Sequence, residues 1–388
     1  MNPSKKLMSN CTAETVLVLG AYGIAGRSVV EGLVNKTTLN IIAGGRNPDK
    51  LSALLTRLDC QRLKTLILDA NHDSALRQAC ANVNLVINCI GPYSVGGFEI
   101  ARQVINCGKP YIDCANEQAH YRRLQSLDRL ARDNGVMLLT AAGQTPGIST
   151  FLLVHAAEQL PQTHALEMFC VQGRLPDAEA GMGSLLGALL EPGFEALTFR
   201  NGDYVAERMG ADIKTESMPL PFGNSKMLGV PIVDALLVPA HVATSLRSLQ
   251  TYFSIGVEPP WGTFTLIRIL KPHRRQWLYN VLCYVIKKVM RKDFQRALNA
   301  GFDTSGFMKF VAHSASQRWQ TVLHFDDGGT ITSYIPVLTA KKLFEGSIVA
   351  TGLVTPIDLF TYSSLLQELE ILGWPLILQQ EQLINTTN

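Results

Sequence analysis

Three glycines near the start of the chain have the spacing of a loop that can hold phosphate groups. Gly20, Gly23 and Gly26 follow the apolar run 15–19, which predicts a buried strand, and they open the segment 24–34, whose apolar spacing predicts a helix. In such a unit the first glycine permits the tight turn, the second lets the backbone approach a pyrophosphate, and the third lets helix and strand pack closely. The loop therefore predicts a dinucleotide site at a helix N-terminus. The alternative is a glycine turn that binds no ligand.

The end of the second predicted strand favours one type of dinucleotide. In NAD sites, an acidic residue about 20 residues beyond the loop binds the ribose 2′-hydroxyl. This sequence instead has Arg46 there, with Lys50 one helical turn further on. Cations suit a 2′-phosphate, so the sequence predicts NADP(H) rather than NAD(H). The alternative for Arg46 is a solvated surface residue. The other loop residues expected to contact the cofactor are Tyr22, Ile24 and Ala25.

Two further strand ends carry candidate cofactor contacts. Asp69 follows the third predicted strand, where it could contact the adenine edge or cap the next helix. The fourth predicted strand ends before Cys89, and Gly91 and Pro92 then form a rigid turn whose backbone can line a cofactor. Tyr93 could stack on a nicotinamide or donate a hydrogen bond to it. Its alternative role is an aromatic lid packed on the domain interface.

The catalytic candidates are Tyr93, Glu117 and His120. A carboxylate or an imidazole beside a reducible substrate can position it or transfer a proton. Each candidate also has a structural alternative. Asp113 or Asn116 could cap the helix that follows, with Glu117 in its first turn, and His120 is expected on the surface of that helix. Because water can supply the proton in a hydride reduction, the catalytic residues are left undefined.

The elements that must position these residues alternate between strand and helix over the first part of the chain. This pattern predicts an α/β fold in which residues 1–150 form a Rossmann domain with a doubly wound parallel sheet. Residues 151–349 predict a second, α+β domain with a largely antiparallel sheet, and the substrate pocket is expected between the two domains. One hairpin is expected to join 318–325 to 330–335. The C-terminal segment 350–388 is expected to be a helix that completes the nucleotide domain.

Composition excludes several classes of protein. The chain has 388 residues, of which 47% are hydrophobic and 17% are charged, and its net charge is +3. A disordered chain is excluded, and the near balance of charges predicts no nucleic-acid partner. Eight cysteines without C-x-x-C spacing predict no metal site and fit a reducing compartment. The polar N-terminus and the lack of an apolar run of about 18 residues predict a cytoplasmic protein.

One segment of the second domain combines apolar and basic residues. Residues 271–292 contain an apolar stretch, 277–290, between the basic clusters 271–275 and 291–292. A helix of this kind could lie on an anionic membrane surface or line a pocket that lipids can reach. The alternative is a helix of the core or of a homodimer interface, with a solvated basic edge.

Four segments, in order, resemble the nucleotide domain of the saccharopine dehydrogenase family. They are the glycine loop 20–27, the segment 88–93, the segment 111–117 and the turn 141–148. The resemblance covers about the first 150 residues. The G-x-Y-G-x-x-G form of the loop is similar to that of the saccharopine dehydrogenase-like and enoyl reductase branch. The resemblance implies NADP(H)-dependent hydride transfer, with the segment 88–93 near the ribose and nicotinamide.

These observations predict an NADP(H)-dependent oxidoreductase. The low charge and the 271–292 segment favour an apolar small-molecule substrate, such as an enoyl or lipid-like compound. A saccharopine reductase of lysine metabolism is an alternative, although the middle region shows no set of arginines for a dicarboxylic amino acid. A scaffold or sensor that binds NADP(H) without turnover is a further alternative.

Overall fold

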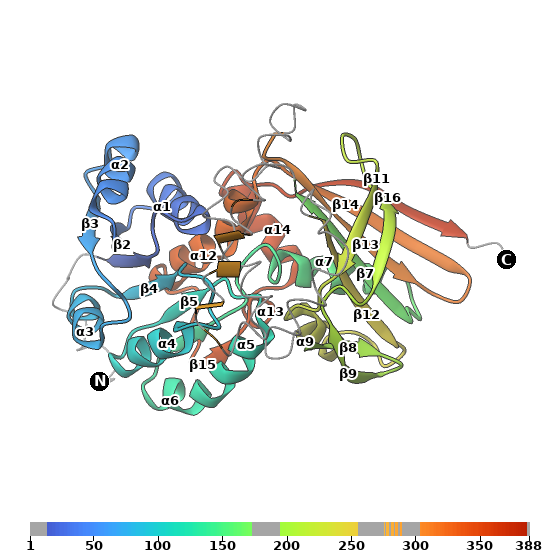
Figure 1. The fold of residues 1–388 in the computed structure, drawn as a ribbon, viewed down its shortest axis with the longest axis horizontal. Coiled ribbons are helices and arrows are strands. Elements are labelled where there is room, and N and C mark those ends of the chain that lie inside the picture. The colour runs from blue at the N-terminus through green and yellow to red at the C-terminus, as the bar shows by residue number, and fades with distance from the viewer. Residues whose placement is uncertain are drawn as a thin grey trace, which may run out of the picture.

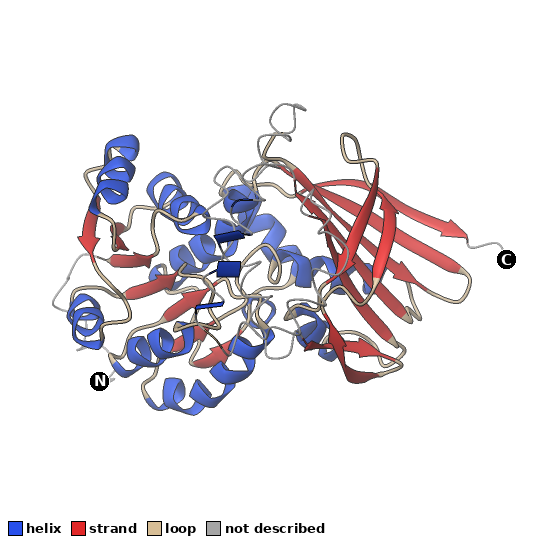
Figure 2. Cartoon of the chain, viewed as in Figure 1, coloured by secondary structure: helices blue, strands red, loops and turns tan. Residues whose placement is uncertain are grey.

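The computed structural model describes residues 14–172, 195–254 and 303–385, together with eight separate residues between 275 and 288. Two sheets lie side by side in this part of the chain, and helices lie between them (Figure 1). Coloured by secondary structure, the molecule divides into a helix-rich half around the first sheet and a strand-rich half formed by the second (Figure 2).

Within the described residues, the first sheet has seven parallel strands in the order β15-β6-β5-β4-β1-β2-β3. The strands are β1 (Thr15–Leu19), β2 (Asn40–Gly45), β3 (Leu63–Ile67), β4 (Leu85–Asn88), β5 (Tyr111–Asp113), β6 (Met137–Leu139) and β15 (Gly352–Val354). The helices are α1 (Ile24–Lys36), α2 (Pro48–Leu58), α3 (Asp73–Ala81), α4 (Gly97–Asn106), α5 (Gln118–Leu124), η2 (Gln125–Leu127), α6 (Asp128–Asp133) and α7 (Ile148–Gln159). The strand order reverses between β1 and β4, which is where ligands bind in such sheets. The predicted α/β class is confirmed.

The second sheet contains nine of the described strands and is mostly antiparallel. The strands are β7 (Ala165–Gln172), β8 (Glu195–Arg200), β9 (Asp203–Arg208), β10 (Ile213–Ser217), β11 (Asn224–Gly229), β12 (Ser248–Ser254), β13 (Gly306–His313), β14 (Gln317–Phe325) and β16 (Ile377–Asn385). The helices given for the described residues of this half are α9 (Asp234–Leu237), η4 (Val238–Ala240), α12 (Gly328–Phe344), α13 (Pro356–Leu359) and α14 (Tyr362–Ile371). Among the strands that the structure describes, only β12 and β7 pair in parallel, so the expectation of a largely antiparallel second sheet is confirmed.

Apolar cores fill both faces of the parallel sheet. Side chains alternate along β1: Val16 and Val18 join a core that extends through α1, α7 and α12 to the second sheet. Leu17 and Leu19 join a separate core with α3 and α4 on the opposite face. A strand that is buried on both faces reads as a continuous apolar run, which is the pattern of 15–19.

The hairpin expected for 318–325 and 330–335 is wrong. The first segment lies in β14, which pairs with β13 and β16, whereas the second lies inside α12. The carboxylate of Asp327 accepts hydrogen bonds from the backbone N–H and the hydroxyl of Thr330, at 2.8 and 2.9 Å. This side-chain cap begins a helix where the Asp-Gly pair had indicated a turn.

The segment 350–388 is not a single helix. In its described part, β15 extends the parallel sheet, α13 and α14 follow, and β16 pairs with β14 in the second sheet. Thr355 and Thr361 each occupy the N-cap of a short helix, and Pro356 fills the first helical position of α13. The C-terminal segment therefore contacts both sheets.

Candidate functional site

The three glycines bring backbone atoms together at the point where the strand order reverses. Gly20 has a φ of +70°, and a Cβ at this position would lie 2.9 Å from the carbonyl oxygen of Cys89, just after β4. A Cβ on Gly26 would collide with the carbonyl oxygen of Gly20. Gly23 is the N-cap of α1 and, among the described residues, no side chain caps this helix end. The N–H groups of its first turn therefore face the loop without a side-chain acceptor, as an anion site requires.

Both predicted cations lie beside this loop. The ring of Tyr22 packs on Gly45 at the end of β2 so closely that a Cβ on Gly45 would collide with the ring. Its hydroxyl accepts a hydrogen bond from the backbone N–H of Arg46 at 3.2 Å, and the ammonium of Lys50 lies 5.7 Å from the ring centroid. The side chains of Arg46 and Lys50 are exposed. The structure thus places two accessible cations at the end of the second strand, where a 2′-phosphate would lie.

Asp69, after β3, is held within its own turn. Its carboxylate accepts hydrogen bonds from the backbone N–H and the side-chain amide of Asn71, at 3.1 and 3.0 Å. The backbone bond from Asn71 is the main cause that lowers the pKa of Asp69, and the nearby charge of Arg46 adds to it. His72 occupies the N-cap of α3, so the alternative in which Asp69 caps this helix is wrong.

Tyr93 fastens the loop after β4 to its own strand. The ring is buried, and the hydroxyl donates to the carbonyl oxygen of Asn88 at 3.0 Å. The Asn88 side chain donates to the hydroxyl of Tyr111 at 2.9 Å and accepts from the backbone N–H of Ile90 at 3.0 Å. Burial raises the pKa of Tyr93 well above its ordinary value, so the phenol keeps its proton. These contacts give Tyr93 the geometry of a packed aromatic whose polar end is already bonded.

Asp113, Glu117 and His120 form a buried cluster next to that loop. Oδ2 of Asp113 lies 2.8 Å from Nε2 of His120, and its Oδ1 accepts from the hydroxyl of Thr140 at 2.6 Å. Glu117 accepts a hydrogen bond from the backbone N–H of Tyr93 at 2.8 Å. The cluster therefore connects the ends of β4, β5 and β6, and it holds the backbone of the loop that follows β4.

The expectation that His120 lies on the surface is wrong, because its imidazole is only 1% exposed. The first turn of α5 packs against the end of β5, which directs His120 toward Asp113, and its ring centroid lies 5.5 Å from that of Tyr93. The capping alternative is wrong as well. Glu117 occupies the N-cap of α5, but no side chain forms a cap hydrogen bond there. The sequence did carry a signal for the pair of Asp113 and His120: a charged side chain ends a predicted strand, and a histidine follows in the next helix.

Glu117 gives the fold a defined pH dependence. Burial raises the pKa of Glu117 from 4.5 to about 7, against the opposing effects of His120 and the Tyr93 backbone N–H. Between pH 4.5 and about 7, the folded protein therefore binds more protons than the unfolded chain. The free energy of unfolding falls as the pH rises through this range. We expect this group to lower the free energy of unfolding by about 3 kcal/mol over that range.

Urea denaturation across this pH range measures the effect, and Glu117→Gln is expected to remove the decline. The exposed Glu99→Gln on α4 is the control and should keep it. An equal decline in Glu117→Gln would show that other groups cause it.

Two features of the site lay beyond the sequence prediction. Gly329, at the start of α12, lies against the first turns of α1: a Cβ there would come within 2.7 Å of Ile24 and 2.9 Å of Ser28. The N-terminus of α12 therefore abuts the helix that follows the glycine loop. The Gly-Gly pair directly after the capping residue Asp327 was the signal for this close approach.

A further buried carboxylate was missed by the sequence prediction. Asp234, at the start of α9, accepts hydrogen bonds from the hydroxyls of Ser149 and Thr150 at 2.6 and 2.5 Å, and burial raises its pKa to about 6. Nearby, the side-chain amide of Gln118 both donates to and accepts from the backbone of Leu197. These bonds tie α5 and α7 to the second half of the chain. No local pattern marks them, because the partners are about 80 residues apart in sequence.

Comparison with known proteins places the glycine loop in a family. The model of the saccharopine dehydrogenase NADP binding domain matches residues 16–139, which span β1 to β6. The N-terminal domain belongs to this family. The resemblance noted for the segments 20–27, 88–93 and 111–117 is thereby confirmed.

Curated relatives of this saccharopine dehydrogenase-type domain are distant. A "lipid droplet localized protein" of Caenorhabditis elegans is 28% identical over 138 residues, covering 33% of this chain and 32% of the relative. A protein of Arabidopsis thaliana named "probable mitochondrial saccharopine dehydrogenase-like oxidoreductase" is 26% identical over 157 residues, covering 37% and 34%. A "trans-acting enoyl reductase" of Mycobacterium ulcerans is 26% identical over 141 residues, covering 35% and 34%. The matched part of the chain spans about a third of the length of these relatives.

One solved structure shares the fold over most of the chain. It is the apo saccharopine dehydrogenase (L-Glu forming) of Saccharomyces cerevisiae, with a TM-score of 0.61. The likeness covers 94% of this chain and 99% of the yeast chain, at 14% sequence identity. It therefore shows that both halves of the chain share the fold of this saccharopine dehydrogenase.

The saccharopine dehydrogenase-type NADP-binding domain implies an NAD(P) cofactor, and the residues present fit one. Gly20 and Gly26 leave a space that a Cβ would fill, the N-terminus of α1 has no side-chain cap, and Arg46 and Lys50 are accessible beside them. Among the residues that the structure describes, no helix has both the length and the apolar character needed to cross a membrane.

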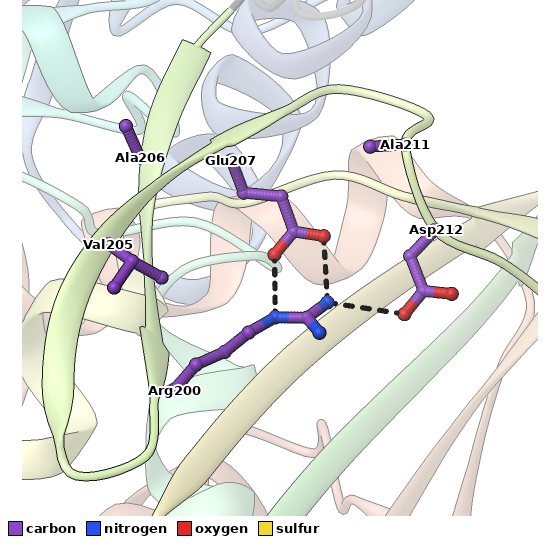
Figure 3. A pocket seen from close by; sticks show the side chains of 6 residues that line it. All are labelled: Arg200, Val205, Ala206, Glu207, Ala211 and Asp212. Carbon is purple, nitrogen blue, oxygen red and sulfur yellow. Dashed lines mark hydrogen bonds and ion pairs between the residues drawn. The ribbon is translucent and has the colours of Figure 1, made fainter.

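One described pocket lies away from this domain, in the second sheet. A cavity of about 380 Å³ is lined by β8, β9 and the turn before β10. Figure 3 shows Arg200 between Glu207 and Asp212, with hydrogen bonds of 2.8 and 3.0 Å to Glu207 and an ion pair of 3.4 Å to Asp212. Because the arginine is already paired with two carboxylates, this pocket provides no free cation for an acidic ligand.

Proposed function

We propose that this chain is an NADP(H)-dependent oxidoreductase that transfers a hydride to or from an apolar small molecule. The observation that carries the proposal is one arrangement at the carboxyl edge of the parallel sheet. The glycine cradle follows β1 and leads into α1, whose N-terminus has no side-chain cap. Two exposed cations, Arg46 and Lys50, follow β2 at the position where NAD sites have a carboxylate. The family of the domain supports the cofactor class.

The chain's own residues would divide the work of binding. The backbone of Gly20–Gly26 and the first turn of α1 would hold the pyrophosphate, and Arg46 with Lys50 would hold the 2′-phosphate. The loop after β4, held by Glu117 and by the Tyr93 hydroxyl, would line the nicotinamide end. When bound, the cofactor supplies or accepts the hydride.

We assign Tyr93, Glu117 and His120 positioning roles. Each is buried, and each already has a hydrogen-bond partner: the Asn88 carbonyl for Tyr93, the Tyr93 N–H for Glu117 and the Asp113 carboxylate for His120. In an enoyl reduction, one carbon receives the hydride and its neighbour receives a proton, which water can supply. The relatives named trans-acting enoyl reductase support this substrate class.

Arg46→Ala is expected to weaken NADPH binding by about 10- to 100-fold, because hydrogen bonds to a charged group contribute about 1.5–3 kcal/mol. NADH binding is expected to stay unchanged, because NADH lacks the 2′-phosphate. Fluorescence titration of each variant with both cofactors measures this, with Arg77→Ala on the exposed face of α3 as the control. A wild-type protein that prefers NADH would overturn the assignment of Arg46, and binding of neither cofactor would overturn the proposed function.

Turnover is tested separately by following NADPH consumption with medium- and long-chain enoyl thioesters and, in the reverse direction, NADP reduction with saccharopine. Consumption with enoyl thioesters alone is the expected result. Turnover of saccharopine would favour a role in lysine metabolism instead. Tight NADPH binding without turnover of any substrate would favour a non-catalytic scaffold or sensor.

A further inference from the structure

Two cysteines lie opposite each other at the ends of neighbouring strands. β4 and β5 pair in parallel, and the last residues in register are Asn88 and Asp113. Cys89 and Cys114 are the next residues along the two strands, so the same register sets them side by side. Side chains at matching positions of parallel strands point to the same face of the sheet. Two thiols therefore meet at the carboxyl edge of the parallel sheet, where the candidate cofactor site lies.

The contacts of both cysteines agree with this register. The thiols of Cys89 and Cys114 form a hydrogen bond, which is the main cause that raises the pKa of Cys114 well above its ordinary value. The Cys114 sulfur lies 3.7 Å from the carbonyl oxygen of Ala142, and a Cβ on Gly143 would lie 3.3 Å from the Cβ of Cys114. Both cysteines are only half-buried, so the pair lies within reach of small molecules in solution.

The spacing of the strands defines the bond that two such thiols can form. Neighbouring strands lie about 4.8 Å apart, within the Cα separation of about 4.4–6.8 Å that a disulfide spans. The two Cβ atoms of a disulfide lie closer together, at about 3.5–4.5 Å. Closing the bond must therefore draw the ends of β4 and β5 together by up to about 1 Å. A disulfide under such strain is readily reduced again, as regulatory disulfides are.

We propose that Cys89 and Cys114 are a modification site at which a small disulfide, such as oxidised glutathione, forms a reversible disulfide bond. The Cys89 thiolate attacks one sulfur of the reagent, so a mixed disulfide forms and one glutathione thiolate leaves. The Cys114 thiolate then attacks the Cys89 sulfur, which forms the bond between the two strands and releases the second glutathione. The two protein thiols lose two electrons and two protons, and the reagent is reduced to two molecules of glutathione. Cys89 attacks first because the raised pKa of Cys114 keeps that thiol protonated.

The bond would change the candidate cofactor site, and this consequence rests on the proposed function. The carbonyl oxygen of Cys89 lies against the glycine loop, where a Cβ on Gly20 would come within 2.9 Å of it. The Tyr93 hydroxyl bridges the two strand ends: it donates to the carbonyl oxygen of Asn88 at 3.0 Å and accepts from the backbone N–H of Cys114 at 3.4 Å. Drawing Cys89 toward Cys114 therefore displaces the loop that would line the nicotinamide end.

Peptide mass spectrometry of the full-length protein tests the site without any cofactor. After treatment with oxidised glutathione, wild type is expected to contain a disulfide between Cys89 and Cys114 that dithiothreitol removes. Cys114→Ser should stop at the intermediate and carry glutathione on Cys89. Wild type that keeps both thiols, or that carries glutathione on Cys89 without closing the bond, would overturn the proposal.

A second pair of cysteines provides the matched control. The thiols of Cys80 and Cys107, on α3 and at the end of α4, also form a hydrogen bond. Cys80 is completely buried, so this pair should stay reduced under the same treatment. Cys107→Ser should form the disulfide between Cys89 and Cys114 as wild type does. Oxidation of the Cys80 pair in place of the other would show that strand register does not select the site.

Fluorescence titration with NADPH tests the consequence for the cofactor. Oxidation of wild type is expected to weaken NADPH binding by about tenfold, the loss of about one hydrogen bond, and dithiothreitol should restore it. Saturating NADPH should in turn lower the equilibrium constant for disulfide formation by the same factor. Unchanged affinity in the oxidised protein would overturn the coupling between thiols and cofactor. Binding of NADPH to neither form would overturn the proposed function, and mass spectrometry would still decide whether the disulfide forms.

Discussion

Replacing Gly26 by alanine is expected to weaken NADPH binding by about 100-fold. The added Cβ would collide with the carbonyl oxygen of Gly20 and would lie 3.0 Å from the Cα of Ala21, and both of these atoms belong to the main chain. No side chain can move aside to make room, so the start of α1 must move away from the loop. Losing two phosphate hydrogen bonds of about 1.5 kcal/mol each corresponds to about 100-fold in affinity.

Isothermal titration with NADPH measures this loss, and thermal unfolding without cofactor measures the accompanying destabilisation of about 1–3 kcal/mol. Gly346→Ala is the matched control. It introduces a Cβ at a φ of +70° with no atom within 4 Å, so it strains the backbone far from the loop. This variant should lose some stability and keep its affinity. Unchanged NADPH affinity in Gly26→Ala would mean that the phosphates bind elsewhere.

Asp113→Ala is expected to lower the free energy of unfolding by about 3–5 kcal/mol, the usual cost of removing one partner from a buried pair. Asp113 is completely buried and is bonded to His120 and to the Thr140 hydroxyl. Without the carboxylate, both partners are left unpaired in an apolar environment. Chemical denaturation at neutral pH measures the loss, and the exposed Asp133→Ala on α6 should change stability by less than about 0.5 kcal/mol.

A double-mutant cycle with His120→Ala separates the pair from its surroundings. If the two residues stabilise the fold through their mutual contact, the double variant should lose much less stability than the sum of the two single variants. Additive losses would show that the 2.8 Å contact contributes little and that packing of each side chain dominates. NADPH affinity in the same variants reports whether the cluster positions the loop after β4.

Much of the candidate nucleotide site could be predicted from sequence because its signals are local. The strand 15–19, the glycines and the helix that follows lie within about 20 residues, and their spacing alone specifies a strand, a tight turn and a helix N-terminus. The position of Arg46 follows from the same βαβ geometry, since parallel strands end at one edge of a sheet. The doubly wound parallel sheet of the first domain could be predicted for the same reason.

Predictions failed where distant segments decide the outcome. His120 was expected on a surface, yet α5 packs it onto Asp113 at the end of a neighbouring strand. Residues 330–335 were expected to be a strand, yet the side chain of Asp327 caps a helix there, and this helix packs against α1. In each case the local pattern was compatible with two structures, and contacts with another part of the chain selected one of them.

The sequence by itself predicts a dinucleotide-binding edge and a preference for a 2′-phosphate, because the glycine spacing and the missing carboxylate are properties of one short stretch of chain. Only the tertiary structure decided that the catalytic candidates are buried and already hydrogen-bonded. It alone placed the N-terminus of α12 against α1 and buried Asp234 against the hydroxyls of Ser149 and Thr150. Burial is a property of the whole packed chain, and no spacing of residues along the sequence specifies which side of a helix the rest of the protein covers.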